Sequence, residues 1–93
     1  MNHACIYFKS TKDESALEIQ KKIDSIIKTY RFEYEFVKIL VETDEFSQLD
    51  IFLNREIDKF DCLILCKPIN DEFYELVLNE LQRQNQLKII QVE

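Results

Sequence analysis

The feature that most constrains the fold is an alternation, along the whole chain, of short apolar runs with longer amphipathic segments. Three segments repeat apolar residues at spacings of three and four, the pattern of a helix with one buried face: 16–30, 46–60 and 71–84. Four further runs are rich in aromatic and β-branched residues, as strands are: 3–9, 32–41, 61–66 and 87–92. Strands that alternate with helices form mostly parallel sheets covered on both faces. The sequence therefore predicts an α/β domain with a four-stranded, mostly parallel sheet.

Local signals support these assignments. Ser15 and Glu18 have the spacing of a capping box, with a hydroxyl at the helix N-terminus and a Glu three residues later. The run 61–66 is apolar on both faces, which is typical of a central strand. Glycine is absent and Pro68 is the single proline, so turns with positive φ must use Asn or Asp. The same absence excludes the glycine-rich phosphate loops of P-loop and dinucleotide-binding proteins.

The size and charge of the chain restrict what it can bind. Its 93 residues fit one domain, 1–93, and a hydrophobic content of 46% is enough for a core. Eighteen acidic residues against 12 basic ones give a net charge of −6. Proteins that bind duplex DNA usually carry a basic stripe, because phosphate neutralisation supplies most of the non-specific affinity. We therefore expect no autonomous DNA binding, and a protein partner instead.

The cysteine and histidine content argues against disulfide and metal sites. Cys5, Cys62 and Cys66 are odd in number and lack the spacing of a disulfide framework. Cys62 and Cys66 share one strand and one side of it, so we expect buried, unreactive thiols. His3 is the single histidine and is expected to face solvent, so we predict no metal and no cofactor. Neither a leader peptide nor an apolar run of about 18 residues is visible, which predicts a cytoplasmic protein without a membrane span.

Acidic residues cluster in two of the loops expected to follow strands: Asp13, Glu14, Glu42, Asp44 and Glu45. If their carboxylates gathered beyond the strand ends they could bind Mg²⁺, as in phosphate-accepting receiver domains of similar topology. Receivers need a phosphoacceptor Asp at the end of the third strand, where this chain has Cys66 and Lys67. That interpretation is therefore disfavoured.

The segment 5–20 resembles the opening of the catalytic domain of serine recombinases, the resolvases and invertases. In that family a Tyr is followed two residues on by an Arg, then two further on by the nucleophilic Ser, and later by a Gln in the first helix. Without a gap, Tyr7 matches the Tyr, Lys9 the Arg, Thr11 the Ser and Gln20 the Gln. The resemblance implies that the position of the family's active site is at the end of the first strand.

The resemblance extends over nearly the whole chain. The segment 41–45 is similar to the family's acidic segment, 59–67 to its Phe-Asp-Val-Val-Leu-Val-x-Lys strand, and 73–93 to its following helix and strand. It implies a resolvase-like (flavodoxin-like) fold: a three-layer α/β/α domain whose sheet has the strand order 2-1-3-4.

The departures from the family pattern are at the residues that carry its chemistry. The family Arg is Lys9 here and the family Ser is Thr11, unless Ser10 substitutes by a slip of one residue. In the segment 68–73 no Asp or Arg stands at the positions where the family has them, and the Ser-Gly after the acidic segment and a nearby Arg are missing. The chain stops at Glu93, before the family's long dimer helix and its DNA-reading domain.

These departures predict a domain without catalysis. Arginines hold the phosphoryl oxygens bidentately during strand cleavage, and losing one well-placed donor commonly costs about 10²–10³ in rate. Lys9, Thr11, Gln20 and Lys67 are then vestigial positions, and an anion would contact Lys9, Ser10, Thr11 and Lys67. We predict a protein-interaction or regulatory module whose partner is a second copy or an active recombinase, in a phage or mobile-element setting. The alternatives are a minimal strand-breaking enzyme that uses Thr11 or Ser10, and an unrelated flavodoxin-like domain.

Overall fold

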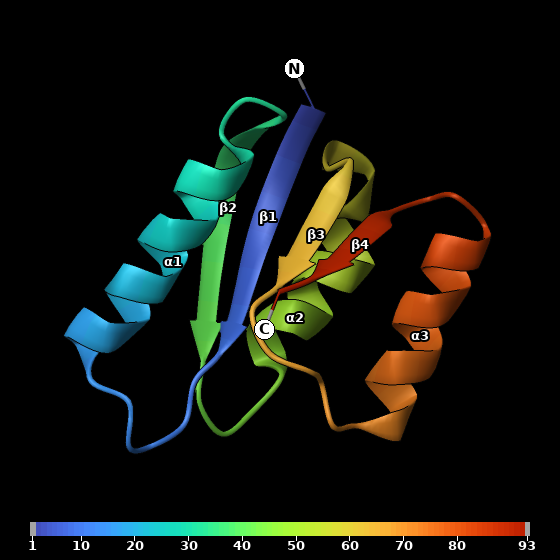
Figure 1. Ribbon diagram of the computed structural model, residues 1–93. Coiled ribbons are helices and arrows are strands. Elements are labelled where there is room, and N and C mark those ends of the chain that lie inside the picture. The colour runs from blue at the N-terminus through green and yellow to red at the C-terminus, as the bar shows by residue number, and fades with distance from the viewer. Residues whose placement is uncertain (1, 93) are drawn as a thin grey trace.

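The computed structural model describes residues 2–92 and contains a four-stranded, entirely parallel sheet flanked by helices (Figure 1). The elements follow in the order β1 (Asn2–Lys9), α1 (Ala16–Tyr30), β2 (Tyr34–Glu42), α2 (Ser47–Ile51), β3 (Cys62–Leu65), α3 (Glu72–Arg83) and β4 (Lys88–Gln91). The strand order is β2-β1-β3-β4. The chain therefore has the expected three-layer α/β/α, flavodoxin-like fold with the order 2-1-3-4.

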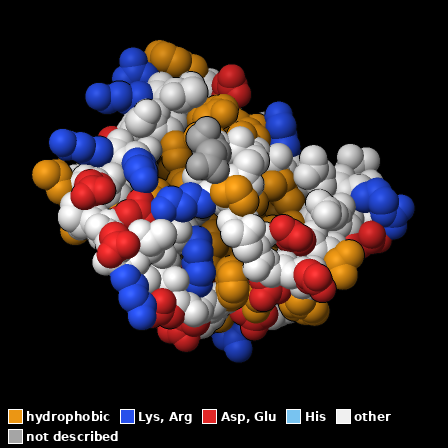
Figure 2. Space-filling model, turned by 60° about the horizontal axis from the view of Figure 1, so that its bottom comes forward, with side chains coloured by type: hydrophobic (Ala, Val, Ile, Leu, Met, Phe, Trp, Pro, Cys, Tyr) orange, Lys and Arg blue, Asp and Glu red, His pale blue; other side chains and the backbone are white. Residues whose placement is uncertain are grey.

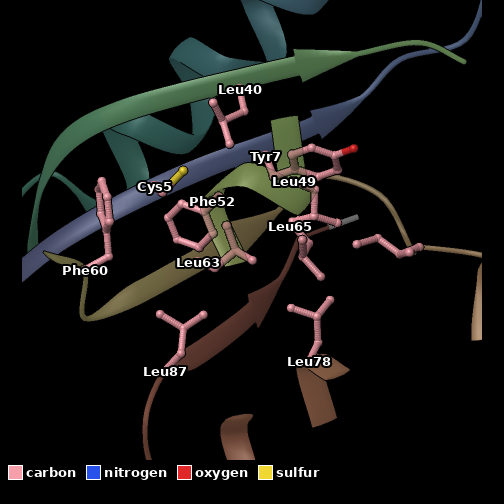
Figure 3. Close-up of a cluster of buried hydrophobic side chains, with 11 residues drawn as sticks. Cys5, Tyr7, Leu40, Leu49, Phe52, Phe60, Leu63, Leu65, Leu78 and Leu87 are labelled. Atoms are coloured by element: carbon pink, nitrogen blue, oxygen red, sulfur yellow. The ribbon is translucent and has the colours of Figure 1, made fainter. Parts of the chain in front are cut away.

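The alternation of side chains along β1 divides the core between two faces of the sheet. Ala4, Ile6 and Phe8 lie in the cluster that α1 covers, together with Ile23 and Ile26 of that helix. The second cluster lies under α2 and α3 and is drawn in Figure 3: Cys5, Tyr7, Leu40, Leu49, Phe52, Phe60, Leu63, Leu65, Ile69, Leu78 and Leu87. Because β1 is buried on both faces, it anchors both layers.

The first helix has the predicted bounds and the predicted cap. The Ser15 hydroxyl accepts a hydrogen bond from the Glu18 N–H at 3.2 Å and lies 3.3 Å from the Glu18 carboxylate. The second strand, in contrast, begins at Tyr34 and not at residue 32. Phe32, which was expected in the strand, lies in the turn after α1 and is 80% exposed, because the Glu33 N–H bonds to the Tyr30 carbonyl and closes that turn.

The segment 46–60 is less regular than the predicted helix. Only Ser47–Ile51 is α-helical; Phe52–Glu56 is π-helical and Ile57–Lys59 is a 3₁₀ turn. Phe52 and Ile57 are five residues apart, a separation that a π turn, with its i→i+5 repeat, brings onto one side. Both side chains contact the core cluster under α2. The wide turn thus serves the packing of this segment.

A bulge interrupts the pairing of β2 with β1. Ala4 pairs with Phe36 but Cys5 pairs with Lys38, so Val37 is an extra residue in β2. Phe36 packs on the α1 side, whereas Leu40 lies in the cluster on the α2 side. The bulge therefore changes the face to which the second half of β2 directs its buried side chains.

The one positive-φ residue among residues 2–92 is Asn85, with φ 58°. It follows α3, where the Gln86 N–H donates to the Leu81 carbonyl at 2.9 Å, a bond typical of helix C-termini that end in a left-handed residue. The expectation that Asn would replace Gly at such turns is confirmed. None of the helices within residues 2–92 has both the length and the apolar composition to span a bilayer.

Candidate functional site

The carboxyl ends of the strands form the end of the molecule that Figure 2 brings forward. Ligand sites of open α/β sheets lie there, at the point where the strand order reverses. In this sheet the point is between β1 and β3, since β2 lies on one side of β1 and β4 lies beyond β3. Basic side chains lie near the middle of this face, with acidic ones on both sides (Figure 2).

Glu14, in the loop after β1, lies at this reversal point between two lysines. Its carboxylate accepts hydrogen bonds from Lys22 of α1 at 2.7 Å, from Lys67 after β3, and from the Thr11 N–H at 2.8 Å. The side chain is 8% exposed. The hydrogen bonds from Lys22 and Lys67 hold the pKa of Glu14 at about 2. The three segments are thereby joined through one ionised carboxylate.

A small cavity of about 250 Å³ adjoins this cluster. Lys22 and Lys67 line it together with largely apolar neighbours: Phe8, Ser25, Ile26, Cys66 and Val92. The Lys67 ammonium lies 5.3 Å from the centre of the Phe8 ring and that of Lys22 lies 5.8 Å from it. The cavity therefore combines two cations with an apolar floor.

Glu42, the last residue of β2, is a second buried carboxylate, and it caps α2. Its oxygens accept hydrogen bonds from the Tyr7 hydroxyl at 2.5 Å, the Ser47 hydroxyl at 3.1 Å, and the N–H groups of Gln48 and Leu49. Burial opposes ionisation of Glu42, but these hydrogen bonds outweigh it and lower its pKa. An anion at a helix N-terminus is also favoured by the unpaired N–H groups there. Glu42 is thus a structural group that joins β1, β2 and α2.

Lys9 lies on the opposite side of the sheet from Lys67. Its ammonium donates to the Glu45 carbonyl and lies 4.1 Å from the centre of the Phe46 ring. Phe46 packs on the α2-side cluster, whereas Phe8, beside Lys67, belongs to the α1-side cluster. The two lysines that the sequence suggested as partners in one anion contact are therefore held by different layers.

The two hydroxyls at the end of β1 also differ. Ser10 is buried, and its Oγ is 2.9 Å from the Thr43 hydroxyl and 3.3 Å from the Glu42 carbonyl, which ties the ends of β1 and β2 together. Thr11 is exposed, and its backbone contacts Glu14. Of the predicted anion contacts, the structure brings Thr11 and Lys67 together, through Glu14.

Gln20 lies apart from this site. It is exposed on α1 and lines a shallow groove of about 410 Å³ between that helix and β2, whose floor includes Ile39 and Val41. Ile39 and Val41 are 44% and 37% exposed. The groove follows the free edge of the sheet, because β2 is an edge strand.

The acidic residues of the two loops do not gather into a cation site. Glu14 pairs with lysines, Glu42 turns inward to cap α2, and Asp44 lies 4.0 Å from Lys12. Among residues 2–92 no group of three or more His, Cys, Asp or Glu side chains is arranged to hold a metal ion. The carboxylates stay apart because each one is held by different partner groups.

The cysteines and the histidine lie as expected from the sequence. The thiols of Cys5, Cys62 and Cys66 are free and buried, with Cys62 and Cys66 in the same cluster. Burial raises the pKa of all three, to about 12 for Cys5 and about 11 for Cys66. His3 is exposed and lies 3.2 Å from Glu35.

Sequence reasoning missed the roles of Glu14 and Glu42. A signal for Glu14 was present, since Thr11 and Glu14 have the same three-residue separation as the Ser15–Glu18 capping box. No local pattern marks Glu42, because its donors come from β1 and from the start of α2. Comparison with known protein families, with curated proteins and with solved structures finds no significant match.

Proposed function

We propose that this chain is a catalytically deficient, resolvase-like domain of the cytoplasm that acts through protein contacts, with a second copy or an active recombinase as its partner. The observation that carries the proposal is the pairing of Glu14 with Lys22 and Lys67 at the strand-order reversal. In a strand-cleaving enzyme this is where cations must receive a phosphodiester. Here a carboxylate of the chain itself already occupies them.

The surroundings reinforce this argument. A DNA phosphate that entered the crevice would lie beside the ionised Glu14 carboxylate and would be repelled, because both groups are negatively charged. Lys9 is held on the other face of the sheet by Glu45 and Phe46. Lysines also lack the bidentate fork with which arginine grips phosphoryl oxygens. The net charge of −6 adds long-range repulsion of nucleic acid.

A protein partner has an accessible apolar surface to contact. Ile39 and Val41 remain exposed in the groove between α1 and the edge strand β2. The unpaired edge of a sheet is a common place for a second chain to associate. A phage or mobile-element setting is part of the proposal through the resemblance of 5–20 to recombinases.

The first experiment incubates the purified protein with supercoiled plasmid and measures nicked DNA and covalent protein–DNA adduct on gels. We expect neither product, and no shift of DNA at low salt. The alternative, a minimal strand-breaking enzyme, is favoured by the exposure of Thr11. It predicts nicking that is lost in Thr11→Ala or Ser10→Ala, and that result would refute the proposal.

The second experiment tests the interaction itself. Sedimentation velocity of the protein, alone and mixed with an active serine recombinase, should reveal a faster species in one of the two samples. Ile39→Glu and Val41→Glu should abolish that species, because both residues line the groove. Leu17→Glu is the matched control, since Leu17 is exposed on α1 but does not line the groove. The absence of a faster species in both samples would contradict the proposed partners.

A further inference from the structure

Three hydrogen-bond donors from three separate segments converge on the Glu14 carboxylate. Lys22 donates to one oxygen, while Lys67 and the Thr11 N–H donate to the other. Two ammonium groups and a backbone N–H are the donors with which proteins hold a free carboxylate or phosphate. The arrangement is therefore an oxyanion site in which the anion belongs to the chain.

The same two ammonium groups also face the neighbouring cavity. The volume of this cavity is about 250 Å³. Phe8, Ile26 and Val92 supply apolar walls beside the lysines. A ligand with a short apolar body can thus lie in the cavity while its charged end reaches Lys22 and Lys67.

The position of the cavity in the fold supports a binding role. It lies at the carboxyl ends of β1 and β3, where the strand order reverses, since Phe8 belongs to β1 and Cys66 follows β3. Ligands of open α/β sheets bind at this point. Glu14 reaches it from the loop after β1.

We propose that the crevice between β1 and β3 is a binding site for a small apolar monocarboxylate, and that Glu14 occupies its charged end as an internal competitor. The ligand's carboxylate replaces that of Glu14 at Lys22 and Lys67, and its apolar body lies against Phe8 and Val92. This inference uses the same Glu14 cluster that argues against strand cleavage, but not the groove proposed for protein contacts. The crevice and the groove at β2 lie on different sides of α1, and no residue lines both sites.

The chemistry of the lining favours a carboxylate over a phosphate. A phosphate monoester brings three charged oxygens, and the site offers two lysines and one N–H group without arginine. The remaining oxygen lone pairs would face Phe8, Ile26 and Val92, and unpaired buried polar groups are costly. A carboxylate has two oxygens, the number that the three donors already serve in Glu14.

Glu14 competes because it is tethered beside the site. A tethered group has an effective concentration of order millimolar or higher, so a free ligand of the same charge binds more weakly while the tether is present. Truncating Glu14 should therefore strengthen binding of the free carboxylate. The effect should be at least about tenfold in dissociation constant.

The test is a titration of the full chain with benzoate, followed by isothermal titration calorimetry and by NMR of the methyl groups of Ile26 and Val92. Glu14→Ala should bind benzoate at least about tenfold more tightly than the unsubstituted chain. Asp13→Ala is the matched control, because it removes the same charge from the same loop without touching the lysines, and it should bind like the unsubstituted chain. Adding Lys67→Met to Glu14→Ala should abolish binding.

Each other outcome of the titration contradicts the inference. If the unsubstituted chain and Glu14→Ala bind benzoate with equal affinity, Glu14 is not a competitor. If inorganic phosphate binds as tightly as benzoate, the apolar walls do not contribute to binding. Glu14→Gln keeps the length of the side chain and serves if Glu14→Ala does not fold. At high benzoate the unsubstituted chain should also show shifts of the Ile26 and Val92 methyl groups. Unshifted methyl groups in all variants refute the site, whereas the plasmid and sedimentation results are unaffected.

Discussion

Replacing Glu42 by Gln tests whether a buried carboxylate holds the second half of the sheet to α2. In the structure each oxygen of Glu42 accepts two hydrogen bonds: Ser47 and the Gln48 N–H on one, Tyr7 and the Leu49 N–H on the other. An amide has one acceptor oxygen, so its NH₂ group must face one hydroxyl, which can rotate to accept, and one backbone N–H, which cannot accept. Glu42→Gln therefore breaks at least one hydrogen bond, sets an NH₂ group against a backbone N–H and removes the negative charge at the helix N-terminus.

The magnitude follows from these losses. A hydrogen bond to a charged group contributes about 1.5–3 kcal/mol, and loss of a helix cap costs about 1 kcal/mol. Removing a buried charge recovers some desolvation energy, but the lowered pKa of Glu42 indicates that its hydrogen bonds outweigh burial. We expect a loss of about 3 kcal/mol from the free energy of unfolding. For a domain of this size the total is roughly 5–15 kcal/mol, and the loss lowers Tm by roughly 12–24 °C.

Urea denaturation followed by circular dichroism measures this difference. Tyr7→Phe removes one of the four donors, a hydrogen bond to a charged group, and should cost about 1.5–3 kcal/mol. The double variant should cost less than the sum of the two single variants, because both remove the same Tyr7–Glu42 bond. Glu45→Gln is the surface control and should stay within about 0.5 kcal/mol, since Glu45 is exposed.

Two results would refute the reasoning about Glu42. If Glu42→Gln stays within about 0.5 kcal/mol of the unsubstituted chain, the carboxylate is not a required cap. If Tyr7→Phe and Glu42→Gln are strictly additive, the two groups do not interact in solution.

Three further predictions concern stability and reactivity. The pKa of Glu14 lies at about 2 against an ordinary 4.5, so on acidification the unfolded chain takes up this proton first. Because solvent screens the pairing with the exposed Lys22, we expect Glu14 to add about 1 kcal/mol above about pH 5, and this stabilisation is lost toward pH 2. Urea unfolding at several pH values should show this difference between the unsubstituted chain and Glu14→Gln, and an unchanging difference would contradict it. Burial and a raised pKa of Cys5, Cys62 and Cys66 predict that iodoacetamide at pH 8 labels the native protein far more slowly than the urea-unfolded one; equal rates argue against buried thiols. Asn85→Ala should cost about 1 kcal/mol at φ 58°, whereas Asn85→Gly should not destabilise, as denaturation midpoints would show.

The fold could be predicted from the sequence because its local signals agree with each other. The three-and-four spacing of apolar residues in 16–30 coincides with α1, and Ser15 marks its start. The doubly apolar run 61–66 contains β3, which is buried at every position, Cys62–Leu65. The irregular segment 46–60 was harder, because apolar spacing does not distinguish an α turn from the π turn at Phe52–Glu56.

The candidate site was predicted less well because its contacts link distant parts of the chain. The sequence suggested that the loop after β1 and Lys67 contribute to one anion site. The two do meet in the structure, but the group that joins them is the Glu14 carboxylate. Lys9 was placed with Lys67 through the resemblance to recombinases and through their charge. Its position on β1, two residues after Tyr7, directs it to the α2 side. Such a side assignment requires knowing which helices cover which face.

The extra residue in β2 has a consequence for how this strand can change. Tyr34, Phe36, Leu40 and Glu42 keep an unbroken even-numbered pattern of partial or full burial, yet the first two contact the layer of α1 and the last two that of α2. Composition therefore does not reveal the crossover between layers; the bulge at Val37 produces it. A regular strand that kept all nine residues would turn Leu40 and Glu42 toward α1 and leave α2 without its carboxylate. Deleting Val37 would instead keep Leu40 opposite Tyr7 and Glu42 opposite Lys9, so the strand could lose the bulge without exchanging its faces.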